Sequence, residues 1–403
     1  MFKLSNNLGA SYSPLYFLSA LGAGGLSISF FIYLMFLTPH PNTPIPTWES
    51  LMAAFQAGNP WMQGLIAVSL VGIVLFALLH IRMLVWNSVE YLRFKPTEGY
   101  QRLRQSNGEV QLMALPLTFA MTINVGFALG AVFVPKLWSV VEYLFPIAMI
   151  AFAIVGGYAL NILLSFMLRT LSTGSFDCTR NNNLSQLLAV FALTMVGVGF
   201  SASAAMSQVA VTSGLAMILA VMFLSFAAVL GLVVLVLGFR GMLQHGVDRE
   251  AAVSLWIIIP IVTLAGITLY RLLMGMHHNF GTEVEPIQNL AMFTVFVSIQ
   301  ILFAMLGYIV MKRLGYFADY LYGSSKSIGA FSLVCPGVAA FVMAFFFIHI
   351  GLVGSGLVTK FSIAHFVLLA PLVLLQLKTI ATLFRLNFKL LKPEPAARLA
   401  VTA

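Results

Sequence analysis

Charged residues are scarce in this chain of 403 residues, since Asp, Glu, Lys and Arg together account for 8% of it. A soluble globular protein carries about 25% charged residues. Hydrophobic residues instead make up 60% of the sequence. This balance excludes a soluble protein and favours one that lies within a lipid bilayer.

Cysteine is also scarce, with only Cys178 and Cys335. The topology derived below places Cys178 in a cytoplasmic connection, where thiols are kept reduced, and Cys335 inside a membrane span, so we expect no disulfide. The sequence has no Walker motif, no dinucleotide fingerprint, no CxxC and no suitably placed HExxH. It therefore gives no support for an ATP-driven pump or a membrane protease.

Long apolar runs fill most of the chain, and ten of them are long enough to cross about 30 Å of hydrocarbon as helices. Because lipid offers the backbone no hydrogen-bond partners, each run should be helical. We expect the first to be a retained helix and not a cleaved signal peptide. The sequence predicts an all-α polytopic membrane protein, a single transmembrane domain over residues 1–403, with spans at about 14–37, 62–84, 111–134, 138–168, 184–206, 212–239, 252–274, 287–311, 328–353 and 361–384.

The positive charges are distributed unevenly between alternate connections. Of the 21 Lys and Arg, only Lys136, Arg271 and Lys360 fall on one side of the predicted membrane. By the positive-inside rule the other side, which carries both termini, is cytoplasmic, and we expect a bacterial inner (plasma) membrane. The net charge of +9 is then explained by topology and by contact with anionic lipid headgroups, without nucleic-acid binding.

The ten spans form five helical hairpins whose two members differ in composition. The odd-numbered spans carry more small and polar residues, such as Gly22, Gly24 and Gly25 in the first and Thr122 and Asn124 in the third. Small residues allow close backbone approach, and hydroxyl groups line water-accessible paths. Two interpretations stay open: an inner ring of odd spans around a central path, or small residues that serve only helix packing.

Three of the odd spans contain proline: Pro116 in MALPLTFAMT, Pro260 in IIIPIVTLAG and Pro336 in FSLVCPGVAAFVMAFFF. With these three prolines and its five hairpins, the chain resembles the tellurite-resistance and C4-dicarboxylate transporter superfamily, which includes the plant slow anion channels. The resemblance implies five inner helices, often kinked at proline, around a pore with a phenylalanine gate. It also implies a homo-oligomer, since trimers are usual in that superfamily.

The motif match departs from the superfamily in two places. The ninth span has Cys335-Pro336-Gly337 where a Phe-Pro pair is typical, and the fifth span has no proline. The chain is also similar to the small bacterial TsoY family, in which a selenocysteine or cysteine occurs in a comparable membrane context. Cys335 is the matching position.

Ionisable groups inside the membrane are the first functional candidates. Arg271 and His349, with Lys360 nearby, would give the outer part of the path a positive field that concentrates anions. The alternative is that Arg271 reaches the headgroups and pairs with Glu142 or a loop glutamate. We take His80 as an anchor at the inner interface. The predicted pathway residues are Arg271, His349, Asn124, Thr122 and Ser332.

Pro336 lacks an N–H and should break the ninth span. Broken backbone at membrane depth persists only where it is buried in protein or lines a cavity. We therefore expect a constriction near residues 332–337, with Cys335, Pro336, Phe331 and Phe341 as gate candidates.

Histidines offer two further possibilities. His349 and His365 lie at similar depth on neighbouring antiparallel spans, as the two ligands of a b-type haem would. The alternative is that each bonds a backbone carbonyl. His277 and His278, with Glu283 and Glu285 in the same outer loop, are not expected to bind a metal.

No carboxylate is predicted near the bilayer centre, where a cation carrier would usually need one. We therefore expect a channel or secondary transporter for a small anion, a carboxylate or inorganic oxyanion, with no catalytic residues and no cofactor. Two alternatives stay open: a quinol- or haem-linked electron-transfer subunit, and a membrane redox protein that uses Cys335.

Overall fold

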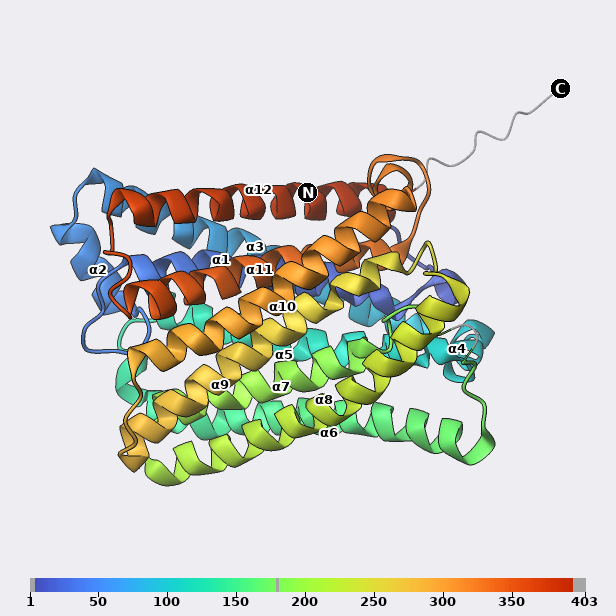
Figure 1. The fold of residues 1–403 in the computed structure, drawn as a ribbon, viewed down its shortest axis with the longest axis horizontal. Coiled ribbons are helices and arrows are strands. Elements are labelled where there is room, and N and C mark those ends of the chain that lie inside the picture. Colours follow the sequence, from blue (N-terminus) through green and yellow to red (C-terminus); the bar gives the residue numbers. More distant parts are fainter. Residues whose placement is uncertain (1–3, 179–180, 394–403) are drawn as a thin grey trace.

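The computed structural model describes residues 4–178 and 181–393. Within these ranges the chain is built from helices, ten of which are long and apolar enough to cross a membrane (Figure 1). The predicted all-α polytopic membrane fold is confirmed. The helices of these spans are α1 (Phe17–Leu37), α3 (Pro60–Phe94), α5 (Ala114–Phe133), α6 (Val141–Thr173), α7 (Leu187–Met206), α8 (Ala210–His245), α9 (Ile258–Phe280), α10 (Pro286–Arg313), α11 (Val334–Phe346) and α12 (Ile363–Leu391). The ninth span covers Ile328–Val353, because α11 is preceded by a 3₁₀ helix and followed by the π-helical segment η8 (Phe347–Val353).

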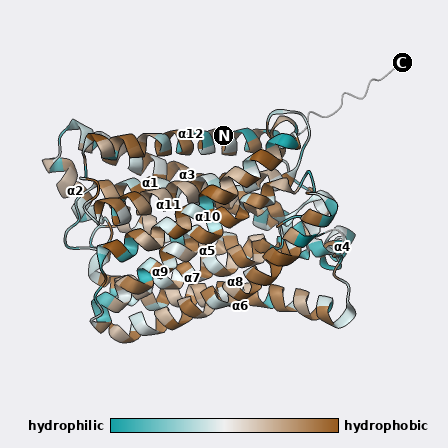
Figure 2. Cartoon of the chain, viewed as in Figure 1, coloured by the Kyte–Doolittle hydropathy of each residue, from teal (hydrophilic) through white to brown (hydrophobic). Residues whose placement is uncertain are grey.

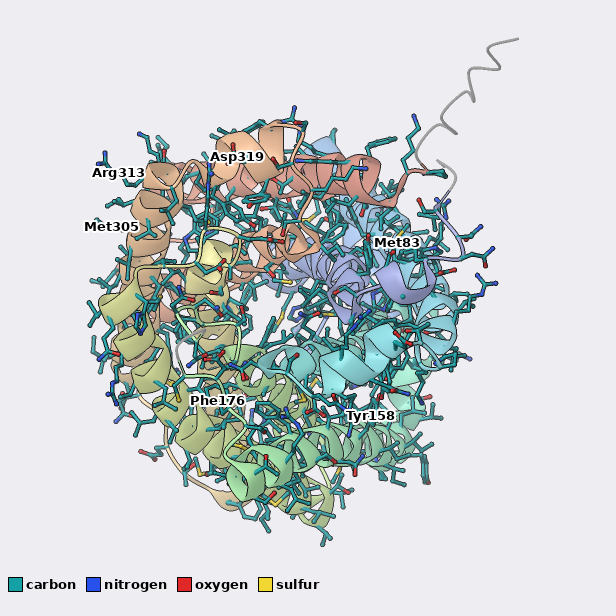
Figure 3. The ribbon with its side chains drawn as sticks, turned by 90° about the vertical axis from the view of Figure 1, so that its right-hand side faces the viewer. Met83, Tyr158, Phe176, Met305, Arg313 and Asp319 are labelled. Atoms are coloured by element: carbon teal, nitrogen blue, oxygen red, sulfur yellow. The ribbon has the colours of Figure 1, made fainter. Side chains whose placement is uncertain are left out.

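The ten helices lie side by side along the longest axis of the molecule, with hydrophilic residues gathered at the two ends (Figures 1 and 2). Ser5 N donates to Leu391 O at 2.9 Å, so both described ends of the chain meet at one face. We call this the terminal face and the other the opposite face; Figure 3 looks onto the terminal face.

The second span is longer than predicted and ends at Phe94 instead of residue 84. Its added turns are anchored by Glu90, which is fully buried and accepts hydrogen bonds from Asn7 N (3.1 Å) and Leu8 N (2.8 Å). Hydropathy alone ended the span too early because one side of these turns is polar and is buried against the amino-terminal segment.

Two short helices lie in the connections. Helix α2 (Trp48–Ala57) follows the proline-rich segment after α1 and begins with a capping box between Thr47 and Ser50; α4 (Glu98–Arg104) follows α3.

The prediction that His277 and His278 lie in a loop is wrong. Both belong to the last turn of α9, which ends at Gly281 in the left-handed conformation (φ +69°).

The odd and even spans differ sharply in burial. Between 56% and 94% of the residues of the odd spans are buried within the protein, against 17–44% for the even spans. Helices α1, α5, α7, α9 and α11 therefore form an inner ring, and α3, α6, α8, α10 and α12 form an outer shell that presents exposed Leu, Val and Ile.

Most inner helices begin at the terminal face with a tight 3₁₀ turn: η2 (Pro14–Tyr16) before α1, η3 (Asn107–Met113) before α5, η5 (Ala252–Ile257) before α9 and η7 (Ile328–Leu333) before α11. Pro116, Pro260 and Pro336 are each the third residue of the α-helix that follows. A first-turn N–H has no partner within its helix, so proline costs little there. Pro336 therefore marks where α11 begins and does not break the middle of the ninth span.

The inner helices approach one another closely at glycine. A Cβ at Gly275 of α9 would lie 2.5 Å from Ala204 O of α7, whereas a Cβ at Gly157 of α6 would meet no atom within 4 Å. We predict that Gly275→Ala destabilises the protein by about 1–3 kcal/mol through overpacking, and that Gly157→Ala does not. Thermal unfolding in detergent measures both variants, and equal melting temperatures would contradict this account of the packing.

Candidate functional site

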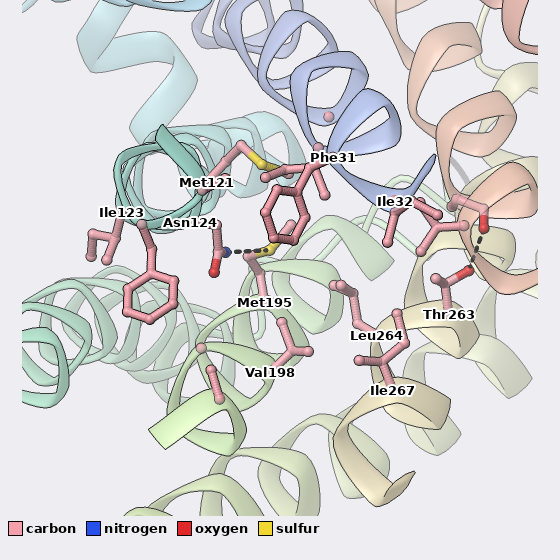
Figure 4. Close-up of a pocket in the computed structure, with 18 of the residues that line it drawn as sticks. Phe31, Ile32, Met121, Ile123, Asn124, Met195, Val198, Thr263, Leu264 and Ile267 are labelled. Carbon is pink, nitrogen blue, oxygen red and sulfur yellow. Dashed lines mark hydrogen bonds between the residues drawn. The ribbon is translucent and has the colours of Figure 1, made fainter. Parts of the chain in front are cut away.

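A cavity of about 180 Å³ lies at the centre of the inner ring (Figure 4). All five inner helices line it, together with residues of α6, and most of the lining is hydrophobic. We call it the central cavity. The lining residues labelled in Figure 4 are Phe31, Ile32, Met121, Ile123, Asn124, Met195, Val198, Thr263, Leu264 and Ile267.

Few polar side chains reach the central cavity. Asn124 Nδ2 donates to Ala120 O at 3.2 Å and lies 3.7 Å from Met195 Sδ. Thr263 Oγ1 is within 2.9 Å of Ile259 O and accepts from Gln300 Nε2 at 2.6 Å. No Asp or Glu of the described chain lines this cavity. The wall therefore offers a few neutral dipoles and no negative charge.

Arg271 supplies the positive charge of the central cavity. Its Nη1 donates to Val198 O at 3.1 Å, and no carboxylate within residues 4–178 and 181–393 forms an ion pair with it. The alternative pairing with Glu142 does not occur, because Glu142 accepts from Ser207 Oγ and Gln208 N, both at 2.7 Å. Arginine has five N–H donors, so most of this guanidinium is left for a ligand.

A second cavity, of about 320 Å³, opens beneath the terminal face. We call it the terminal vestibule. Its lining mixes apolar and polar side chains, and the polar ones include the carboxamides of Asn107, Gln111, Asn181, Asn183 and Gln186 and the hydroxyls of Ser185, Ser254, Ser327 and Ser332. Asp248 and Glu250 line it as well, and the buried Ser327 Oγ has no hydrogen-bond partner. Ser332 and Pro336, predicted for the pathway and the gate, belong to this vestibule.

Three residues line both cavities: Phe191 of α7, Pro260 of α9 and Cys335 of α11. They therefore form the constriction between the central cavity and the terminal vestibule. Cys335 was predicted near a gate, but Phe191 was not, because nothing in the sequence distinguishes it among 34 phenylalanines.

Phe331 and Phe341, the two predicted gate phenylalanines, are fully buried and line neither cavity. Phe331 packs against Tyr16 (ring centroids 6.4 Å apart) and Phe341 against Tyr33 (5.4 Å). A gate must border the path that it closes. The structure therefore does not place these two rings beside the cavities, and both take part in the packing between α1, η2 and the ninth span.

Thr122 is also placed away from the central cavity. It bonds Thr118 O (2.9 Å) and His80 Nε2 (2.9 Å), while His80 Nδ1 bonds Ala20 O at 2.8 Å. His80 is fully buried where α1, α3 and α5 meet, so the expectation of an anchor at the headgroups is wrong. The polar side chain of Thr122 serves the contact between these helices and not the pathway.

His349 and His365 do meet, but they bond to each other. Their Nε2 atoms are 3.1 Å apart, with the ring planes at 88°. His349 Nδ1 donates to Phe345 O (2.8 Å) and His365 Nδ1 accepts from Phe361 N (3.4 Å), so His365 Nε2–H is assigned as the donor to His349 Nε2. Each ring thus has both nitrogens satisfied in a neutral tautomer.

This arrangement does not fit a haem ligated by the two histidines. An iron would have to lie between the two Nε2 atoms, where they now share a hydrogen bond, and the His349 ring is stacked on Phe36 (4.6 Å) and Phe345 (5.3 Å). His349 also lines neither the central cavity nor the terminal vestibule. Nearby Lys360, outside the spans, is exposed and places its ammonium group over the Phe361 ring, and partial desolvation lowers the pKa of that group.

His277 and His278 each bond a backbone carbonyl, Thr282 O (2.7 Å) and Ala205 O (3.3 Å). The two cysteines are free, Cys178 at the surface and Cys335 buried.

Comparison of the chain with protein-family models, with curated proteins and with solved structures finds no match. The resemblance to the tellurite-resistance and C4-dicarboxylate transporter superfamily, and to the TsoY family, therefore stays a prediction from topology and from the three prolines.

Proposed function

We propose that this chain is a channel or secondary transporter for a small anion, either a carboxylate or an inorganic oxyanion. The path runs from the terminal vestibule through the constriction at Phe191, Pro260 and Cys335 into the central cavity. The observation that carries the proposal is Arg271, a guanidinium that lines an apolar cavity and has no carboxylate partner among the described residues.

An unpaired charge in an apolar cavity interacts strongly with a mobile ion because little solvent screens it. Guanidinium binds carboxylate and oxyanion groups through two parallel hydrogen bonds, which favours these ligands. A cation entering the same cavity would meet the positive charge and no compensating carboxylate. The central cavity therefore selects for negative charge.

The terminal vestibule contributes less to selection by charge. Asp248 and Glu250 line it, and Asp248 Oδ1 accepts from Ala251 N at 2.8 Å. The inner helices begin here, so the positive ends of their dipoles point toward the vestibule and offset these carboxylates. We assign the vestibule to ion entry and the central cavity to selection.

For orientation, we propose that the terminal face is cytoplasmic and that the protein lies in a bacterial inner membrane. The support is the charge asymmetry: within residues 4–178 and 181–393, Lys136, Arg271 and Lys360 are the Lys and Arg of the opposite half. The exposed apolar residues of the outer shell contact lipid or, in a homo-oligomer, a second copy of the chain.

Removal of the Arg271 charge should impair transport. In proteoliposomes we predict that Arg271→Gln lowers anion flux roughly ten- to hundredfold, because a hydrogen bond to a charged group contributes about 1.5–3 kcal/mol. Arg271→Lys should restore part of the flux. Lys136→Gln, which removes an exposed cation between α5 and α6, is the control and should leave flux unchanged. Equal flux through Arg271→Gln and the parent protein would refute the proposal.

Widening the constriction should increase anion flux. We predict that Phe191→Ala raises anion flux and speeds the reaction of Cys335 with a methanethiosulfonate reagent in a Cys178→Ser background, because the ring and the thiol line the same narrow segment. Phe226→Ala, at an exposed phenylalanine of α8, is the matched control. If modification of Cys335 leaves anion flux unchanged both in the Cys178→Ser background and in its Phe191→Ala variant, the anion path does not pass Cys335.

A further inference from the structure

A third cavity, of about 240 Å³, lies between the halves of α6 and α8 that are nearest the terminal face, and α7 and η3 form its back wall. The two helices diverge toward the terminal face (Figure 1). We call this cavity the α6–α8 groove. Its apolar lining consists of Ile162, Leu163, Phe166, Met167 and Leu171 of α6 and Leu230, Val233, Val234 and Leu237 of α8, together with Val110, Met113, Phe176 and Ala189.

The groove is open toward lipid. Leu164 and Leu168 on α6 are 62% and 71% exposed, and Leu232 and Val236 on α8 are 67% and 60% exposed. Both helices belong to the outer shell, so these side chains face hydrocarbon in a bilayer. An apolar groove at this depth does not hold water. If it stayed empty, its lining atoms would lose their dispersion contacts.

The end of the groove nearest the terminal face is positively charged. The carboxylate of Glu109, a lining residue, pairs with Arg104 (2.9 Å) and with Arg169 (3.1 Å), so these three side chains together carry one net positive charge. The N–H groups of Arg169 already donate to Glu109, to Ser175 Oγ and to the carbonyls of Gln105 and Ser106, so Arg169 contributes charge and not free donors. Exposed Arg240 follows Leu237 by three residues, so it lies on the same side of α8, one turn closer to the terminal face. The groove therefore joins an apolar slot at membrane depth to cationic groups at headgroup level.

The groove also borders the terminal vestibule, because Val110, Asn181 and Gln186 line both cavities. Its occupant would therefore touch the side chains that shape the entrance of the central path.

We propose that the α6–α8 groove binds one acyl chain of an anionic glycerophospholipid from the leaflet at the terminal face, with the phosphate beside Arg169 and Arg240. A helix from a second copy, about 10–12 Å across, is too wide to enter such a slot, whereas a single acyl chain is slender and is abundant at this position. The headgroup charge complements the excess guanidinium. The proposal does not depend on anion transport and stands or falls separately from it.

Native mass spectrometry of the purified full chain tests the proposal. We expect the parent protein to retain one phospholipid, and Val234→Trp, which fills the groove, to lose it. Leu232→Trp, two residues away and directed outward, is the matched control and should keep the lipid. On re-addition of lipid to delipidated protein, phosphatidylglycerol should bind several-fold more tightly than phosphatidylcholine, and Arg240→Gln should reduce that preference.

Three results would overturn the proposal. They are equal lipid retention in Val234→Trp and Leu232→Trp, a retained mass that matches detergent or free fatty acid, and equal affinity for the two phospholipids in the parent protein. Leu163→Trp fills the groove from α6 and replaces Val234→Trp if that variant does not fold, with the same outcomes expected.

Discussion

The bilayer supplies no hydrogen-bond partners, and the rest of this structure depends on that constraint. Each crossing must satisfy its own backbone, so the chain crosses ten times as helices. Polar side chains within the crossings must then turn inward, and burial divides the spans into an inner ring and an outer shell. The same constraint makes Arg271 conspicuous, since its charge is held inside the ring and no ion pair neutralises it among the described residues.

We propose that the two cavities have different roles in the anion path. The terminal vestibule carries carboxamides and hydroxyls among its apolar lining, and in the proposed path these groups would replace part of the water that an ion loses. The central cavity is mostly apolar and is lined by one cationic group, so in the proposed path it would discriminate between ions by the sign of their charge. Between them the ring of Phe191 and the thiol of Cys335 narrow the route, and such a short apolar segment passes ions only when it widens or becomes wet.

Most of the architecture followed from hydropathy and charge, because crossing length and loop charge are one-dimensional properties. The rotation of a helix about its own axis is not a one-dimensional property, and the wrong predictions of residue position came from it. Phe331 and Phe341 lie on an inner helix yet turn toward neighbouring spans, and Thr122 turns toward His80. An inner helix is largely buried among other helices, so its residue pattern does not reveal which residue faces the centre. Arg271 and Asn124 do line the central cavity, because strongly polar groups within a span have few other places to lie. The similar depth of His349 and His365 was predicted from the sequence, but the hydrogen bond between them was not, because it depends on atomic positions.

The central claim is that an anion occupies the central cavity beside Arg271. An experimental structure of the protein with selenate, located by the anomalous scattering of selenium, tests it most directly. The account predicts a selenium peak within the central cavity, with selenate oxygens at hydrogen-bond distance from the Arg271 guanidinium. A central cavity that holds no selenate at saturating concentration, or one that is filled by a tetrapyrrole, would contradict the account.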